Sequence, residues 1–308
     1  MANITAKDVA ELRAKTGLGM MDCKKALVEA EGDMDKAITI LREKGLATAA
    51  KKESRIAADG IVKLMNKGDA YAMIEVNSET DFVAKNETFR TFVRGLLETV
   101  IATRPANVEE LMTKTMGDGK TVEAALQEKT YTIGEKLDIR RFVTVDGTVS
   151  TYIHGGGSTG VVVRFEAAEA ALANEGFAEF AKNVALQVAA MPAQYVDRTA
   201  VPENVLAEER AILEAQMAQD PKMANKPAKV LEGIINGKLG KFFETYCLVD
   251  QAYVKDDSMT VGKYVAATAK EFGGDIKIVA FYRFDKGEGI EKREDNLAEE
   301  VAKMTGKA

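Results

Sequence analysis

The sequence contains few of the residues from which catalytic and metal-binding sites are usually built. Among 308 residues there is one histidine, His154, there are two cysteines, Cys23 and Cys247, and there is no tryptophan. The cysteines lie far apart, and neither has a neighbouring histidine or cysteine at a zinc-binding spacing. We therefore expect two free thiols in a reducing, cytoplasmic environment, and we expect no metal ion and no cofactor.

Long apolar runs and an excess of positive charge are also missing. No apolar stretch approaches the roughly 18–20 residues that span a membrane, so we expect no membrane-spanning segment. The formal net charge is −6 at pH 7, which argues against direct binding of nucleic acid, because that needs clustered Lys and Arg. The residues that follow Met1 lack the basic and then apolar pattern of a signal peptide, which also indicates a cytoplasmic protein.

Two glycine-containing segments resemble nucleotide-binding motifs but stand in the wrong context. The segment 155–160 has glycine at its first, third and sixth positions, as in a dinucleotide-binding loop, but three valines follow where that loop needs a helix. We therefore interpret it as a hairpin turn. Gly119, Lys120 and Thr121 resemble the end of a phosphate-binding loop, but Lys114 stands where its first glycine belongs, so we expect an ordinary loop before a helix.

The lone histidine, His154, precedes the glycine turn. An enzyme built around it as a general base would be one class of function. No serine or cysteine nucleophile motif and no convergent pair of carboxylates is visible near it, which favours a surface or contact histidine. We therefore expect no catalytic residue and no enzyme, and we expect the chain to act through another macromolecule.

The segment 1–56 predicts three short helices around a thin core. Residues that cap a helix start, and glycines that end one, recur at suitable intervals through it. In chain order these are a capping box of Thr5 with Asp8, a stop at Gly17, caps at Asp22 and Asp33, and a stop at Gly45. Met20 and Met21 fall in the loop between the first two helices, where methionines either fill gaps in the core or form an adaptable contact surface.

An internal repeat follows this segment. The segments 59–62, 71–76 and 89–93 recur in the same order as 146–149, 160–165 and 177–181. Each copy predicts a hairpin and then an amphipathic helix, so each predicts a helix packed on a small antiparallel sheet. The fold class is therefore expected to be α+β with a duplicated core.

Further elements lie between and after the two copies. A helix at 121–129 and a strand at 138–145 separate them. Helices at 202–219 and 227–243, joined by a short polar turn, predict an antiparallel helical hairpin inserted into the second copy. The chain then predicts a helix at 261–272, a strand at 276–284 and a last helix at 295–304.

The most informative segment is a corner between a predicted strand at 72–76 and a predicted helix at 88–102. It consists of Thr80, Asp81, Phe82 and Val83. In one interpretation Phe82 folds back beneath the following helix, which would contribute about 1.5–3 kcal/mol, and Asp81 caps that helix. In the other the corner is a wedge, with an apolar tip and an adjacent charge offered to a partner.

Four motifs occur here in the order in which the bacterial elongation factor Ts family carries them. They are MMDCKKAL at 20–27, TDFV at 80–83, HG at 154–155 and GEGIEK at 287–292. The chain resembles that family over essentially its whole length, and the first two motifs are specific to it. It departs from the common family pattern at 77–79, at 158–159 and at Lys136.

The resemblance implies a translation elongation factor that acts as a guanine-nucleotide exchange factor for the GTPase elongation factor Tu. It implies no covalent chemistry, no direct nucleic-acid binding, and a heterodimer or a 2:2 complex. It also implies a ubiquitin-associated-like three-helix module at 1–56, core subdomains at 57–145 and at 146–201 with 246–290, a helical hairpin at 202–245, and a C-terminal helical module at 291–308.

The resemblance also assigns roles to residues. The wedge that dislocates the partner's Mg²⁺ is expected to be Thr80, Asp81, Phe82 and Val83. Contacts to the partner are expected from Arg13, Met20, Met21 and His154. The alternative class is a ribosome- or RNA-associated adaptor without exchange activity, which the acidic composition disfavours because RNA binding calls for a basic stripe.

Overall fold

The computed structural model describes residues 4–220, 222–223 and 226–291. It is a mixed α+β structure, as predicted, with helices and small sheets. The chain divides into two compact units. The first comprises Met1–Met65, Ala72–Thr144 and Asp285–Ala308, and the second comprises Asn66–Tyr71 and Val145–Phe284. No helix in the described part of the chain is both long enough and apolar enough to cross a membrane.

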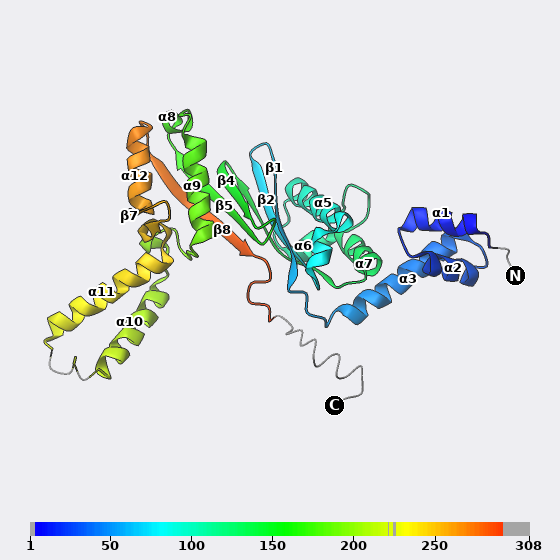
Figure 1. The fold of residues 1–308 in the computed structure, drawn as a ribbon, viewed down its shortest axis with the longest axis horizontal. Helices are drawn as coiled ribbons and strands as arrows, with labels where there is room; N and C mark the ends of the chain where they lie inside the picture. The colour runs from blue at the N-terminus through cyan, green and yellow to red at the C-terminus, as the bar shows by residue number, and fades with distance from the viewer. Residues whose placement is uncertain (1–3, 221, 224–225, 292–308) are drawn as a thin grey trace. The chain divides into compact units, whose positions relative to one another are not determined.

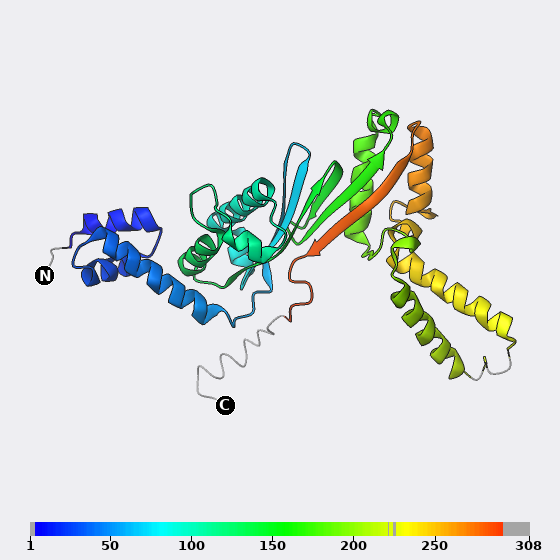
Figure 2. The ribbon, with the colours of Figure 1, turned by 180° about the vertical axis from the view of Figure 1, so that it is seen from behind.

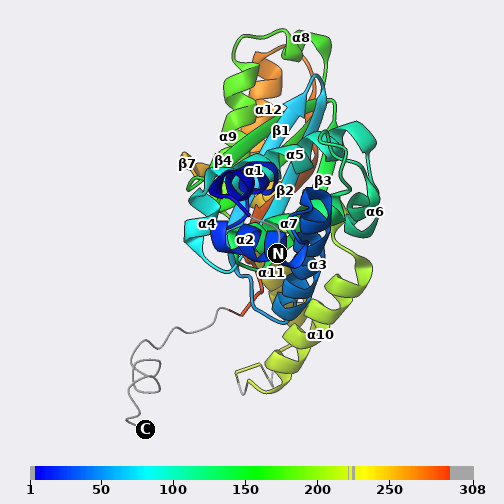
Figure 3. The same ribbon diagram turned by 90° about the vertical axis from the view of Figure 1, so that its right-hand side faces the viewer.

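The first unit opens with three helices that pack around a small apolar core (Figures 1 and 3). They are α1 Ala6–Thr16, α2 Met20–Glu29 and α3 Met34–Lys52. Their core contains Leu12, Leu27 and Leu41, and Tyr131 of a later helix packs against it. The three helices predicted for this segment are therefore confirmed.

Three of the predicted helix signals are confirmed in this segment. The Thr5 side chain accepts a hydrogen bond from the Asp8 N–H, and the Asp8 carboxylate accepts one from the Thr5 N–H at 2.8 Å, which completes the capping box. Gly17 ends α1 in the left-handed conformation, with φ of 68°. Asp33 caps α3 by accepting hydrogen bonds from the backbone N–H groups of the helix's first turn.

Three predictions in the same segment are wrong. Asp22 does not cap α2, because the helix already begins at Met20 after Gly19, and Asp22 lies in its first turn. Met20 and Met21 are consequently helical residues and not loop residues. Gly45 does not end α3, which continues to Lys52, because α3 packs against a later helix and Tyr131 lies alongside Gly45. Tertiary contact here outweighs the low helix propensity of glycine.

The first sheet has the order β1-β2-β3, and its strands are labelled in Figure 3. Its strands are β1 Asp59–Lys67, β2 Ala70–Ser78 and β3 Leu137–Asp146. The helices between β2 and β3 are α4 Asp81–Lys85, α5 Glu87–Thr103, α6 Val108–Thr113 and α7 Val122–Ile133. The predicted strands at 72–76 and 138–145 and the predicted helices at 88–102 and 121–129 are all confirmed, with ends that differ by a few residues.

The second sheet has the order β4-β5-β8, and its three strands are seen from behind in Figure 2. The strands are β4 Thr148–His154, β5 Thr159–Ala167 and β8 Ile276–Asp285. β4 and β5 pair antiparallel from Thr148 opposite Phe165 to His154 opposite Thr159. The hairpin turn predicted at 155–160 is confirmed, and it consists of residues 155–158, since 159 and 160 already belong to β5. The helices α9 Phe177–Ala190 and α12 Val261–Glu271 bury this sheet's apolar face.

A pair of helices is inserted between α9 and β8. They are α10 Glu203–Ala218 and α11 Ala228–Tyr246, and they lie side by side in Figures 1 and 2. Leu213, Met217 and Ile235 are the buried side chains between them. The shorter elements of this unit are α8 Glu169–Leu172, η1 Arg198–Ala200, η2 Leu248–Asp250, β6 Ala252–Tyr253 and β7 Asp256–Thr260. The helix predicted at 295–304 lies outside the described residues.

Candidate functional site

The strand-to-helix corner presents a large aromatic side chain to solvent. β2 ends at Ser78, and the short helix α4 begins at Asp81. Phe82 is 78% exposed, whereas the next residue, Val83, is only 7% exposed. The interpretation in which Phe82 folds beneath the following helix is therefore wrong, and Val83 makes the buried contact instead. An exposed Phe forgoes about 1.5–3 kcal/mol of burial, so its position calls for an explanation outside the folding of this chain.

Asp81 is paired with a cation beside the exposed ring. Its carboxylate accepts a hydrogen bond from the Lys85 ammonium at 2.7 Å, and this bond holds the pKa of Asp81 below its ordinary value. The Lys85 ammonium also lies 5.9 Å from the centroid of the Phe82 ring. Asp81 does not cap the long helix α5, as one interpretation expected, because Asn86 accepts the Thr88 N–H at 2.8 Å and fills that position.

The turn that follows α7 supports the corner through hydrogen bonds. The Glu135 carboxylate accepts two hydrogen bonds from Thr80, from its N–H at 2.9 Å and from its hydroxyl at 2.6 Å. The Lys136 N–H donates in turn to the Glu79 carboxylate at 2.6 Å. The sequence alone does not predict these contacts, because the predicted helix ends at residue 129, whereas α7 continues to Ile133 and ends at Gly134, directly before Glu135.

A hollow opens beside the exposed ring. Its volume is about 260 Å³, and its lining combines apolar carbon with the polar groups of a helix start. The lining residues are Phe82, Val83, Asn86, Thr88, Thr132 and Ile133. The corner therefore offers a projecting ring together with an adjacent concave surface, which is the shape of a contact surface.

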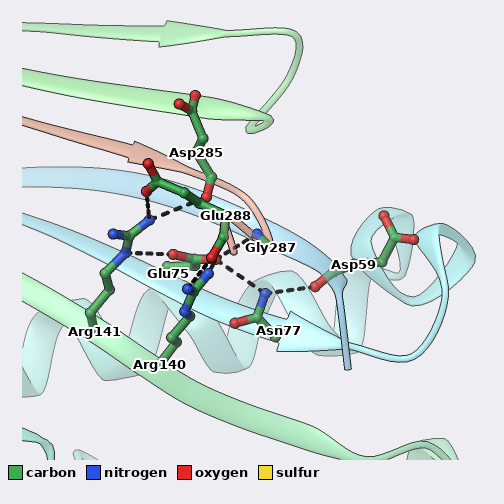
Figure 4. A network of polar contacts seen from close by, with 8 residues as sticks. All are labelled: Asp59, Glu75, Asn77, Arg140, Arg141, Asp285, Gly287 and Glu288. Carbon is green, nitrogen blue, oxygen red and sulfur yellow. Dashed lines mark hydrogen bonds and ion pairs between the residues drawn. The ribbon is translucent and has the colours of Figure 1, made fainter. Parts of the chain in front are cut away.

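A buried carboxylate lies on the same strand β2, three residues before the strand ends (Figure 4). Glu75 is fully buried in β2, and it pairs with Arg140 at 3.1 Å and with Arg141 at 2.6 Å. It also accepts the Gly287 N–H at 2.7 Å, and Arg141 donates to Glu288 at 2.9 Å. This cluster fastens the segment 285–288 to the first sheet and places part of the GEGIEK motif.

The remaining predicted contact residues lie on other elements. Arg13 is exposed on α1, and Met20 and Met21 are 57% and 62% exposed at the start of α2. The two methionines therefore do not fill core gaps. His154 is exposed at the end of β4 in the second unit, where its Nδ1 lies 3.2 Å from the Tyr152 hydroxyl. The structure brings the four corner residues together, and it gives the other predicted residues solvent-facing positions.

Groups that would support metal or thiol chemistry are not assembled in the described ranges. No three His, Cys, Asp or Glu side chains in those ranges lie close enough together to hold a metal ion. Cys23 and Cys247 are both buried and unbridged. Burial raises the pKa of the Cys247 thiol to about 11, so this thiol remains protonated at neutral pH.

The fold and the site define a two-unit α+β protein that carries an exposed acid and aromatic pair at a strand-to-helix corner. The family model described as elongation factor TS matches residues 79–288, which include this corner. The chain is also 49% identical over 308 residues to elongation factor Ts of Clostridioides difficile (strain 630), covering 99% of both chains. The chain therefore belongs to the elongation factor Ts family, whose role is in translation elongation.

Proposed function

We propose that this chain is a guanine-nucleotide exchange factor for elongation factor Tu. It binds the GDP-loaded GTPase and promotes release of GDP in favour of GTP by disturbing the Mg²⁺ and phosphate site. The observation that carries the proposal is the 78% exposure of Phe82 directly beside the charged Asp81. An apolar side chain held in solvent by the fold gains its burial energy only when a partner covers it.

Exchange requires that the factor binds the empty GTPase more tightly than the loaded one. Because binding is reciprocal, the factor and GDP weaken each other by the same ratio. A ratio of ~10³–10⁵ corresponds to about 4–7 kcal/mol of differential interaction. Burial of one aromatic anchor supplies about 1.5–3 kcal/mol, and a few hydrogen bonds to charged groups supply the remainder.

The corner residues divide this task between them. Phe82 is the wedge, and Asp81 acts on the shell of the partner's Mg²⁺, which the GTPase holds through its phosphates. Asp81 is not itself a metal site, because one carboxylate without further oxygen ligands binds Mg²⁺ poorly. Thr80 and Val83 fix the corner, through the Glu135 contact and through burial respectively.

Docking is assigned to residues away from the corner. Arg13, Met20 and Met21 contact the GTPase from the three-helix module, and His154 contacts it from the second unit. Exposed methionines suit this role because their side chains adapt to a partner surface. In this proposal the chain acts in the cytoplasm, without a cofactor, in a heterodimer or a 2:2 complex, and its parts follow the subdomain boundaries that the resemblance implies.

The proposal is tested by measuring the affinity of the chain for elongation factor Tu at increasing GDP concentration. Linkage requires the apparent dissociation constant of the chain for the GTPase to rise with GDP concentration and to level off once GDP saturates the GTPase. The total rise must equal the ratio by which the chain weakens GDP binding. An affinity that does not change with GDP would refute exchange activity, and a steep salt dependence of RNA binding would favour the adaptor class instead.

A further inference from the structure

We propose that Glu135 is the positioning residue of the wedge. Its carboxylate keeps Phe82 facing solvent by accepting two hydrogen bonds from Thr80. Thr80 donates to this carboxylate twice, through its N–H at 2.9 Å and through its hydroxyl at 2.6 Å. Each carboxylate oxygen accepts one of these bonds. The two bonds together fix the direction in which the backbone enters Asp81. The effect of Glu135 on nucleotide exchange rests on the proposed function, whereas its contact with Thr80 does not.

The segments 79–80 and 135–136 hydrogen-bond to each other in both directions. Glu135 accepts from Thr80, and the neighbouring Lys136 N–H donates to the Glu79 carboxylate at 2.6 Å. Arg55 donates to the same Glu79 carboxylate at 3.2 and 3.3 Å. Two consecutive residues of the turn therefore hold Thr80 of the corner and Glu79 just before it, which prevents the corner from rotating about a single bond. Hydrogen bonds to carboxylates are stronger than those between neutral groups.

The helix that carries Phe82 needs this external support. α4 has only five residues, and no side chain caps its first N–H groups. A helix of one turn is not stable by itself, because nucleation costs more than its few hydrogen bonds return. Thr80 occupies the position of the capping residue, but its hydroxyl donates to Glu135 instead of accepting from α4. The contact with Glu135 therefore supports α4 by fixing Thr80, the residue that precedes the helix, and not by capping its N–H groups.

The turn that carries Glu135 is set by a glycine. Gly134 ends α7 with φ of 87°, and its N–H donates to the Thr130 carbonyl. This left-handed conformation is strained for any residue with a Cβ. The end of α7 therefore determines where the Glu135 carboxylate lies, and α7 becomes part of the machinery that presents the wedge.

The test uses the full chain with substitutions on both sides of the contact. Glu135→Gln keeps one acceptor oxygen but places an NH₂ donor where the second acceptor stood. Thr80→Val keeps the shape of the side chain and removes its hydroxyl, whereas Thr80→Ser keeps the hydroxyl. Glu123→Gln, at an exposed acid near the start of α7, is the matched control for loss of one charge.

The first readout needs no partner, and exchange of core amides distinguishes a local opening at the corner from a general loss of stability. We expect Glu135→Gln to accelerate hydrogen exchange of the Thr80 N–H by about ten-fold, since a bond to a charged acceptor is lost. A fluorine label on the Phe82 ring should show a changed or broadened signal. The thermal unfolding midpoint and the exchange of core amides in β2 should match those of Glu123→Gln.

The second readout is GDP release from elongation factor Tu. We expect Glu135→Gln to slow release at a saturating concentration of chain by about ten-fold, and Thr80→Ser to be about ten-fold faster than Thr80→Val. The double variant Glu135→Gln with Thr80→Val should be no slower than the slower single variant, because both changes remove one shared contact.

The outcomes separate this inference from the function on which it rests. If the wild-type chain does not accelerate GDP release, the proposed exchange function fails, and the Thr80 hydrogen exchange and the Phe82 signal still decide whether Glu135 positions the corner. If the wild-type chain is active and Glu135→Gln leaves the Thr80 N–H, the Phe82 signal and GDP release at wild-type values, the positioning role is overturned. Additive losses in the double variant would also overturn it.

Discussion

The exposed ring of Phe82 permits a direct separation of function from stability. Because 78% of its surface already faces solvent, Phe82→Ala should change the free energy of unfolding by about 1 kcal/mol or less. It should slow GDP release by about ten-fold or more, since the anchor of the interface is removed. Phe89→Ala is the matched control, because Phe89 is fully buried and its loss should cost about 3–5 kcal/mol. A Phe82→Ala chain that unfolds easily would contradict the exposed position.

The charge of Asp81 leads to a prediction about the metal. Asp81→Asn should slow GDP release most at millimolar Mg²⁺ and much less when the metal is chelated, because chelation replaces the effect of the carboxylate. Lys85 keeps the pKa of Asp81 below its ordinary value, so the carboxylate is ionised and the effect of the substitution should not change between about pH 6 and 8. Equal losses at both Mg²⁺ levels would show that Asp81 only shapes the corner.

Among single residues, sequence reasoning located the corner but not the orientation of its side chains. The strand before the corner and the helix after it set its place in the chain, and both were predicted correctly. Whether Phe82 or Val83 points inward depends on how the short helix α4 is rotated, and the contact of Thr80 with Glu135, 55 residues away in sequence, supports that helix. No local pattern contains this information.

At the scale of elements, the Glu75 cluster links β2 and β3 to the segment 285–288. Glu75 is fully buried, and its charge is matched by Arg140 and Arg141. Glu75→Gln should lower the free energy of unfolding by about 3–5 kcal/mol, because the paired cations lose their counter-charge and the Gly287 N–H loses its charged acceptor. Urea unfolding measures this loss.

The control for this substitution is Glu98→Gln on the exposed face of α5, which removes the same charge without removing a buried pair. Its effect should stay within about 0.5 kcal/mol. A loss of less than 1 kcal/mol for Glu75→Gln would mean that the cluster does not hold segment 285–288 in solution.

Local signals predicted most elements, and tertiary contact explains one of the errors. The capping box at Thr5 and Asp8 and the stop at Gly17 depend only on neighbouring residues, and both are confirmed. Gly45 was expected to end α3, but packing against α7 extends the helix to Lys52. The pairing of β8 with β5 joins residues separated by more than a hundred positions, so periodicity finds the strand and not its partner.

At the scale of the whole molecule, docking and exchange are assigned to different elements. The exposed methionines Met20 and Met21 lie on α2, and the exposed ring of Phe82, the proposed wedge, lies on α4. Met20→Gln with Met21→Gln should therefore raise the chain concentration needed for half-maximal GDP release by about ten-fold, since two apolar contacts are lost. The release rate at saturating chain should stay close to that of wild type. A lowered limiting rate with unchanged half-saturation would assign these residues to exchange itself.

The most direct test of the account is the rate of GDP release from purified elongation factor Tu with substoichiometric amounts of this chain. An exchange factor is regenerated after each cycle, so we predict that all of the labelled GDP leaves at an accelerated rate and that the rate rises with chain concentration. An unchanged rate at micromolar chain would contradict the account, and so would a burst of release limited to one GDP per chain.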